Sequence, residues 1–236
     1  SLIMSELDKR ITAYHEGGHA LVAMLTPDSD PVHKVTIIPR GMALGVTQTL
    51  PEEDRLNYNR DQIVAIIKHA MGGRAAEELV FNQFTTGASN DLEQATDWAH
   101  RMVCKYGMST KLGPVSFGDE SGDVFLGRDF VARKDYSENT AREIDNEVGE
   151  LLRGLYAEAR DLLAENRELL DSIATALLER ETLEGRDLEV LRRGEELPVL
   201  GSLLSNDDDP KKRDESGEEH KDFPGGRIPD PEPIVS

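Results

Sequence analysis

Residues 15–19, which read HEGGH, constrain the fold of this chain more than any other segment. Two histidines four residues apart share one face of a helix, about one turn from each other, so His15 and His19 can bind one metal ion if this segment is helical. The flanking sequence supports a helix, because apolar residues recur at helical spacing over residues 5–26 and Ser5 is a plausible N-cap. We therefore predict that the first helix carries a two-histidine metal motif.

Zinc is the metal that this pattern favours, because neutral imidazoles suit it and a catalytic zinc takes three protein ligands and one water. Glu16 projects beside the ligands, where it can take a proton from the zinc-bound water as that water attacks a peptide carbonyl. We predict a zinc endopeptidase site with His15 and His19 as ligands and Glu16 as general base. The competing interpretation is that the histidines pack at a helix interface while Glu16 is solvated.

The HExxH motif does not identify the third zinc ligand. The extended pattern HExxHxxGxxH is excluded, because Val22 and Leu25 stand where it needs glycine and histidine. No pairing among the remaining histidines suggests a site; they are His33, His69, His100 and His220. A carboxylate from Glu77, Glu78 or Asp91 is the alternative. Asp91 is also explained as a first-turn acid favoured by the helix dipole, and the two glutamates as solvated residues, so the residues alone do not choose.

The composition limits partners and compartment. A net charge of −19 over 236 residues argues against nucleic acid and anionic membrane surfaces, since both are met by clustered Lys and Arg. Cys104 is the one cysteine, so no internal disulfide forms and nothing requires an oxidising compartment. We find no signal peptide and no apolar run near the ~20 residues that cross a bilayer, and we expect the chain as given to be soluble.

We expect a mainly α fold with a small β ribbon and a C-terminal helical hairpin. Alternating patterns predict strands at 32–38 and 46–50. Helical periodicity predicts helices at residues 5–26, 60–80, 91–106, 137–163, 166–180 and 183–193. The glycines at 72 and 73 can interrupt the second helix, and Asn90 with Glu93 matches a capping box at the start of the third. The helices at 137–163 and 166–180 form the predicted hairpin.

The composition changes at about residue 205. Residues 1–204 are predicted to form the zinc peptidase domain, with a site region at about 5–106, a Gly-rich connector from 107 and C-terminal helices at about 137–193. Residues 205–236 are acidic and rich in proline and contain almost nothing to bury, so we predict a disordered tail.

Four segments in the same order resemble the peptidase domain of the FtsH family of membrane-anchored, ATP-dependent zinc proteases. They are residues 11–16 (ITAYHE), 32–41 (VHKVTIIPRG), 72–78 (GGRAAEE) and 86–92 (TGASNDL). The similarity continues through the C-terminal helices, from about Ser5 to Arg193, and this order of motifs argues against chance.

The resemblance implies that Asp91 is the third zinc ligand and that Glu77 or Glu78 supports the site. It also implies a homohexameric ring that degrades unfolded or misassembled proteins delivered by an attached ATPase, anchored in a membrane with this domain on the cytoplasmic side. The sequence has no GxxxxGK[ST] phosphate-binding loop and no membrane span, so we interpret the chain as an excised peptidase domain that binds zinc but not ATP. Residues 35–45 are expected to offer a strand edge to which a substrate backbone adds.

One residue departs from the family. Gly17 stands where these proteins usually have alanine, and a glycine inside a helix costs about 1 kcal/mol relative to alanine. The alternative function is a non-catalytic hexamer-assembly module with a structural metal. The intact Glu16 argues against it, because a structural zinc has a closed shell and no use for a base.

Overall fold

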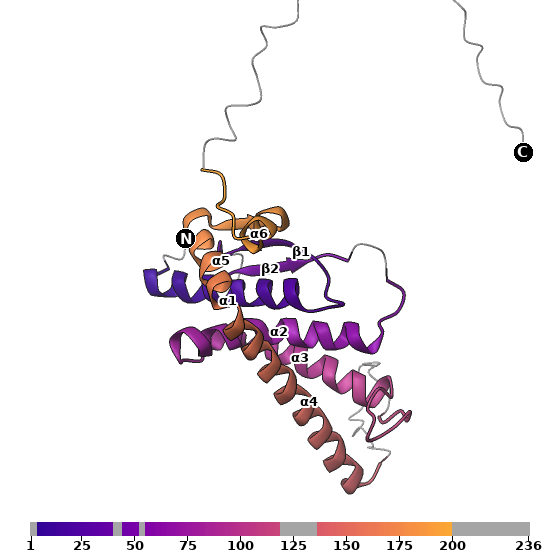
Figure 1. The fold of residues 1–236 in the computed structure, drawn as a ribbon. Helices are drawn as coiled ribbons and strands as arrows, with labels where there is room; N and C mark the ends of the chain where they lie inside the picture. Colours follow the sequence, from indigo (N-terminus) through magenta and orange to yellow (C-terminus); the bar gives the residue numbers. More distant parts are fainter. Residues whose placement is uncertain (1–3, 40–43, 52–54, 119–135, 200–236) are drawn as a thin grey trace, which may run out of the picture. The chain divides into compact units, whose positions relative to one another are not determined.

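A computed structural model of the chain describes residues 4–39, 44–51, 55–118 and 136–199. Within these ranges it contains six α-helices and one small sheet, so the prediction of a mainly α fold is confirmed (Figure 1). The elements in chain order are α1 (Glu6–Leu25), β1 (Val32–Thr36), β2 (Val46–Thr49), α2 (Arg60–Phe81), α3 (Ser89–His100), α4 (Glu138–Glu165), α5 (Arg167–Arg180), β3 (Thr182–Glu184) and α6 (Gly185–Arg192).

The chain divides into a large unit, Ser1–Leu197, and a short C-terminal one, Pro198–Ser236. The boundary predicted at residue 204 and the predicted disordered tail at 205–236 lie outside the described residues. None of the helices that the structure describes is both long and apolar enough to span a bilayer.

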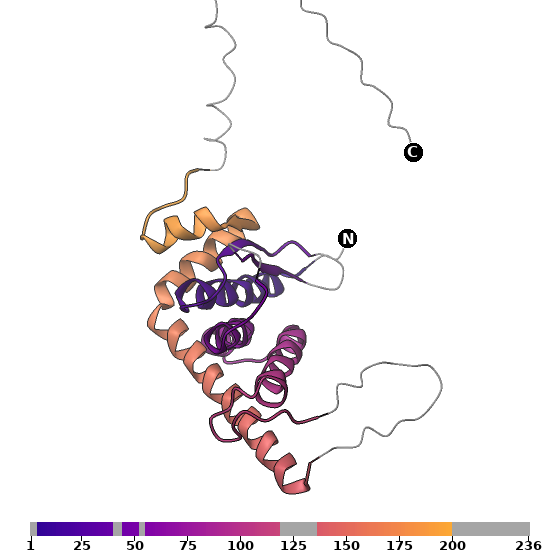
Figure 2. The ribbon, with the colours of Figure 1, turned by 90° about the vertical axis from the view of Figure 1, so that its right-hand side faces the viewer.

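Helix α1 is the centre of the large unit. Ser5 caps it as predicted, since its Oγ accepts the backbone N–H of Asp8 at 3.1 Å and the Asp8 carboxylate accepts the Ser5 N–H at 3.3 Å. From Thr12 to Ala23 every residue is buried. Figures 1 and 2 show the reason: the sheet covers one side of α1 and α2 runs along the other.

Helices α1 and α2 touch backbone to backbone. A Cβ added to Gly18 would lie 2.4 Å from the carbonyl oxygen of Gly72, and one added to Gly72 would lie 2.7 Å from the carbonyl oxygen of Gly18. Helix α2 runs unbroken through Gly72 and Gly73, so the expected interruption is wrong. These glycines allow close helix packing rather than a break in the helix.

The sheet has three antiparallel strands in the order β2-β1-β3, which confirms the predicted ribbon and adds a strand. Val35 pairs with Thr47 on one side and with Leu183 on the other. Because both sides of β1 are paired, residues 35 and 36 cannot offer a free edge; within the described part of the chain the edge beside the predicted site is β2. Residues 40–43 of the expected 35–45 edge lie outside the described residues.

The C-terminal helices do not form the predicted hairpin. Figures 1 and 2 show α5 leading on from α4 rather than folding back alongside it, with α4 packed on α2 and α5 on α1. A hairpin of helices needs a reversing loop of about 2–5 residues. Only Asn166 separates the two helices, so the chain bends there without reversing.

The third helix also begins differently from the prediction. A 3₁₀ turn, Thr86–Ala88, leads directly into α3 at Ser89, and no side chain caps the helix, so the Asn90–Glu93 capping box is wrong. This early start places Asp91 in the first turn of α3.

Candidate metal centre

Three side chains from α1 and α3 meet at the metal motif. The Nε2 atoms of His15 and His19 are 3.1 Å apart, and Oδ2 of Asp91 lies 3.2 Å from the first and 3.3 Å from the second. Ligands bound at about 2.0–2.1 Å in a tetrahedral zinc shell are about 3.3 Å apart, so this triangle fits zinc. Among the described residues it is the one group of three His, Cys, Asp or Glu side chains close enough to hold a metal ion.

The other ring nitrogen of each histidine, Nδ1, donates a hydrogen bond. Nδ1 of His15 donates to Oε1 of Glu77 at 2.6 Å, and Nδ1 of His19 donates to the carbonyl oxygen of His69 at 2.8 Å. The other oxygen of Glu77 accepts the backbone N–H of Thr85 at 2.9 Å. These bonds orient both rings so that each Nε2 points to the carboxylate of Asp91, where both can act as ligands of one metal ion.

The structure separates the three candidate carboxylates. Asp91 lies at the Nε2 atoms, whereas Glu77, which is 1% exposed, lies behind His15. Glu78 is directed elsewhere, where it accepts the hydroxyl of Tyr156 and lies 3.5 Å from Nε of Arg160. Of the two glutamates, Glu77 is therefore the one that contacts the histidine pair.

The electrostatics of the cluster favour a cation. Burial lowers the pKa of His15, but its hydrogen bonds to Asp91 and Glu77 outweigh burial and raise the pKa to about 10. Burial likewise raises the pKa of Asp91, yet the hydrogen bonds from His15 and His19 hold it well below its usual range. The pKa of Glu77 is also lowered, because its bonds to His15 and Thr85 outweigh burial. Two ionised carboxylates thus attract positive charge to this point.

Glu16 is 6% exposed, which rules out the competing interpretation that this side chain is solvated. Its Oε2 accepts the hydroxyl of Thr47, in β2, at 2.7 Å. Glu16 shares a cavity of about 1010 Å³ with the three possible ligands. Apolar side chains of Ile11, Leu44 and Val46 also line this cavity, which gives it room and a partly apolar wall for a peptide.

Sequence reasoning named Glu77 but missed two other residues of α2 that face the site, His69 and Gly73. A Cβ added to Gly73 would lie 2.5 Å from Nε2 of both His15 and His19, so only glycine fits beside the ligands. The ring of His69 packs edge-on against His19, with the ring centroids 5.5 Å apart. His69, Gly73 and Glu77 recur every fourth residue, and this spacing was the signal that one face of α2 serves the site.

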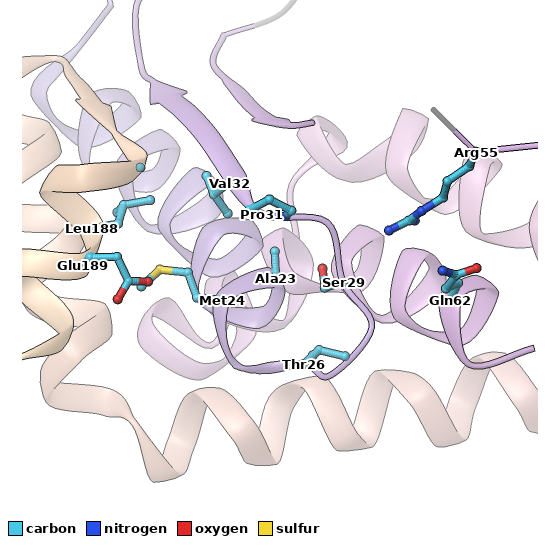
Figure 3. A pocket seen from close by; sticks show the side chains of 11 residues that line it. Ala23, Met24, Thr26, Ser29, Pro31, Val32, Arg55, Gln62, Leu188 and Glu189 are labelled. Atoms are coloured by element: carbon cyan, nitrogen blue, oxygen red, sulfur yellow. The ribbon is translucent and has the colours of Figure 1, made fainter. Parts of the chain in front are cut away.

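A second cavity, of about 710 Å³, lies at the other end of α1 (Figure 3). It is bordered by Ala23 and Met24 of α1, by Leu188 and Glu189 of α6, and by Arg55. Arg55 is paired with Asp30 at 2.6 Å. No group of metal-ligating side chains borders this cavity in the described part of the chain, so it does not compete with the first as the functional site.

Comparison with known proteins agrees with this geometry. The model of peptidase family M41 matches residues 2–191. The ATP-dependent zinc metalloprotease FtsH 4 of Sorangium cellulosum is 57% identical over 200 residues, which cover 84% of this chain and 31% of that protein. The FtsH proteins of Myxococcus xanthus and Rubrobacter xylanophilus are each 54% identical, over 84% and 81% of this chain and 31% and 29% of their own lengths. The chain thus spans just under a third of these curated relatives.

Proposed function

Because the chain belongs to peptidase family M41, we propose that His15, His19 and Asp91 hold its zinc ion and that Glu16 is its general base. Membership in the family makes the chain a zinc metalloendopeptidase. The observation that carries the assignment of residues is the triangle of ligand atoms at 3.1–3.3 Å, with Glu16 in the same cavity.

Zinc, when bound, would polarise the carbonyl of the scissile peptide and acidify water beside it. Glu16 takes the proton of the attacking water and passes it to the leaving amine. Among the described residues only Thr47 hydrogen-bonds to the Glu16 side chain, through Oε2, and this leaves Oε1 to carry the proton. Glu77 holds the His15 ring in place through Nδ1.

A substrate peptide would lie along β2. This strand is at an edge of the sheet, its residues Val46 and Thr47 line the cavity, and Val46 is 37% exposed. An extended peptide added to β2 would be held by main-chain hydrogen bonds and so could be cut with little dependence on its side chains. Loose or unfolded proteins fit this requirement, because their backbones are free to pair.

The whole protein is proposed to be a membrane-anchored homohexamer in which an ATPase delivers unfolded or misassembled proteins to this domain on the cytoplasmic side. The support is the likeness to proteins named ATP-dependent zinc metalloprotease FtsH, of which this chain spans about 31%. ATP would act in a segment beyond this chain. The non-catalytic assembly module is the weaker alternative, because such a module has no use for a buried base such as Glu16.

The test compares wild type with Glu16→Gln and Asp91→Asn in zinc content and in cleavage of casein. We expect Glu16→Gln to keep about one zinc per chain and to lose cleavage by about 10²-fold or more, and Asp91→Asn to lose zinc. Glu78→Gln is the matched control and should keep both. Full cleavage by a zinc-loaded Glu16→Gln protein would contradict the assignment of the base.

A further inference from the structure

The edge strand β2 holds the carboxylate of Glu16 from one side. The hydroxyl of Thr47 donates to Oε2 of Glu16 at 2.7 Å and lies 3.0 Å from the backbone carbonyl oxygen of Glu16. The backbone of Thr47 is itself fixed by its pairing with Val35 in β1. The hydroxyl therefore ties the sheet to α1 at one residue of the metal motif.

The backbone at Gly45 also lies close to the Glu16 side chain. A Cβ added there would lie 2.7 Å from Cγ and 2.7 Å from Oε1 of Glu16, and 2.9 Å from the carbonyl oxygen of Thr36. The backbone at Gly45 thus runs against the carboxylate. The Glu16 side chain therefore lies against this backbone and is hydrogen-bonded to the Thr47 hydroxyl.

We propose that Thr47 is a positioning residue that, against the backbone of Gly45, fixes the Glu16 carboxylate in one orientation beside His15 and His19. The proposal rests on the proposed role of Glu16 as the general base. A base displaced by about 1 Å can lose about 10²-fold in rate, so a side chain that fixes it matters although it touches no reacting atom. Without the hydroxyl, the nearly buried Oε2 would lack its hydrogen-bond partner, and this bond would no longer hold the carboxylate in its orientation.

The strand to which a peptide is proposed to add is therefore also the strand that orients the base. Peptide binding uses the main chain of β2, whereas orientation of the base uses the Thr47 side chain. Loss of the hydroxyl should then lower kcat and leave KM nearly unchanged, whereas damage to the strand would change KM.

The kinetic test uses Thr47→Val, which keeps the shape of the side chain and its preference for a strand but removes the hydroxyl. Thr49→Val is the matched control, because Thr49 is half-buried on the same face of β2. With a short unstructured peptide as substrate, we expect Thr47→Val to lower kcat at least about tenfold with KM within about twofold. Thr47→Ser should recover most of kcat, Thr49→Val should match wild type, and all variants should keep their zinc.

A second readout is independent of activity. In metal-free protein, urea unfolding is measured for Thr47→Val in the wild-type and Glu16→Ala backgrounds. A hydrogen bond to a carboxylate predicts that Thr47→Val raises the unfolding constant about tenfold or more in the first background. The effect should be clearly smaller in the second, where the hydroxyl can donate only to the backbone carbonyl oxygen of residue 16. Thr49→Val should change the unfolding constant by the same factor in the wild-type and Glu16→Ala backgrounds.

Equal effects of Thr47→Val in both backgrounds, or an unchanged kcat in that variant, would overturn the proposal. If Thr47→Val does not fold, Thr47→Ser is compared with Thr47→Ala, and equal kcat values in these two would overturn it as well. Failure of the proposed function is a separate result, because it would appear as full activity of zinc-loaded Glu16→Gln.

Discussion

Replacing Gly73 with alanine tests the packing that forms the metal centre. The added Cβ would lie 2.5 Å from Nε2 of His15 and of His19, whereas non-bonded carbon contacts are about 3.5–4.0 Å. An overlap of about 1 Å or more has to be relieved. Helix α2 cannot retreat without breaking the backbone contact that Gly72, the residue before Gly73, makes with Gly18. The histidines must move instead, by half the length of a zinc–nitrogen bond.

We therefore expect Gly73→Ala to weaken zinc binding at least about 100-fold. Mutating a residue that only hydrogen-bonds to a metal ligand typically weakens it by about 10–100-fold. The assay is competition for zinc with a chromophoric chelator, and circular dichroism confirms folding. Gly154→Ala in α4 is the control, because a Cβ there meets no atom within 4 Å. It should leave zinc binding unchanged and stabilise the helix by up to about 1 kcal/mol. Wild-type zinc affinity in Gly73→Ala would refute the reasoning.

Three further predictions concern the same region. Glu77→Gln should weaken zinc binding about 10–100-fold, because it weakens the hydrogen bond that orients His15, whereas Glu78→Gln should leave zinc binding unchanged. Competition with a chelator measures the zinc affinity of both variants, and equal affinities in the two would contradict the role assigned to Glu77. Gly17→Ala should raise the free energy of unfolding, measured by urea titration, by less than about 1 kcal/mol. The helix gains propensity, but the new Cβ would lie 3.3 Å from Cγ2 of Ile173. A free energy of unfolding lowered by more than about 1 kcal/mol would show that this contact cannot relax. Zinc affinity should rise about tenfold per pH unit between about pH 7 and 9 and level off near pH 10. The reason is that zinc displaces the proton of His15, whose pKa is raised to about 10. A zinc affinity that does not change with pH would contradict this.

Local signals in the sequence located the elements but not their partners. Ser5 and the helical spacing after it predicted α1, because capping and periodicity act within a few residues. The strand β3 has only three residues and takes its conformation from pairing with β1, so local periodicity places residues 183 and 184 in the helix that follows. The expected hairpin failed because helical periodicity says nothing about the direction of the next helix.

The candidate site divides in the same way. The two histidines and Glu16 could be found from one helix, whereas Asp91 comes from a helix more than 70 residues away. Only family resemblance chose it over Glu77 and Glu78 as the third ligand. Glu77 and Glu78 are neighbours in sequence but point about 100° apart on α2, and packing against α1 decides which one meets His15. Strand alternation likewise does not say which face of β2 meets Glu16.

The most direct test of the central claim is a crystal structure of the zinc-loaded protein with anomalous diffraction recorded at the zinc edge. We predict one zinc ion per chain, bound by Nε2 of His15, Nε2 of His19 and a carboxylate oxygen of Asp91, with Glu77 bonded to His15 and not to the metal. Zinc bound through Glu77 or Glu78 in place of Asp91, or bound away from the two histidines, would contradict the account.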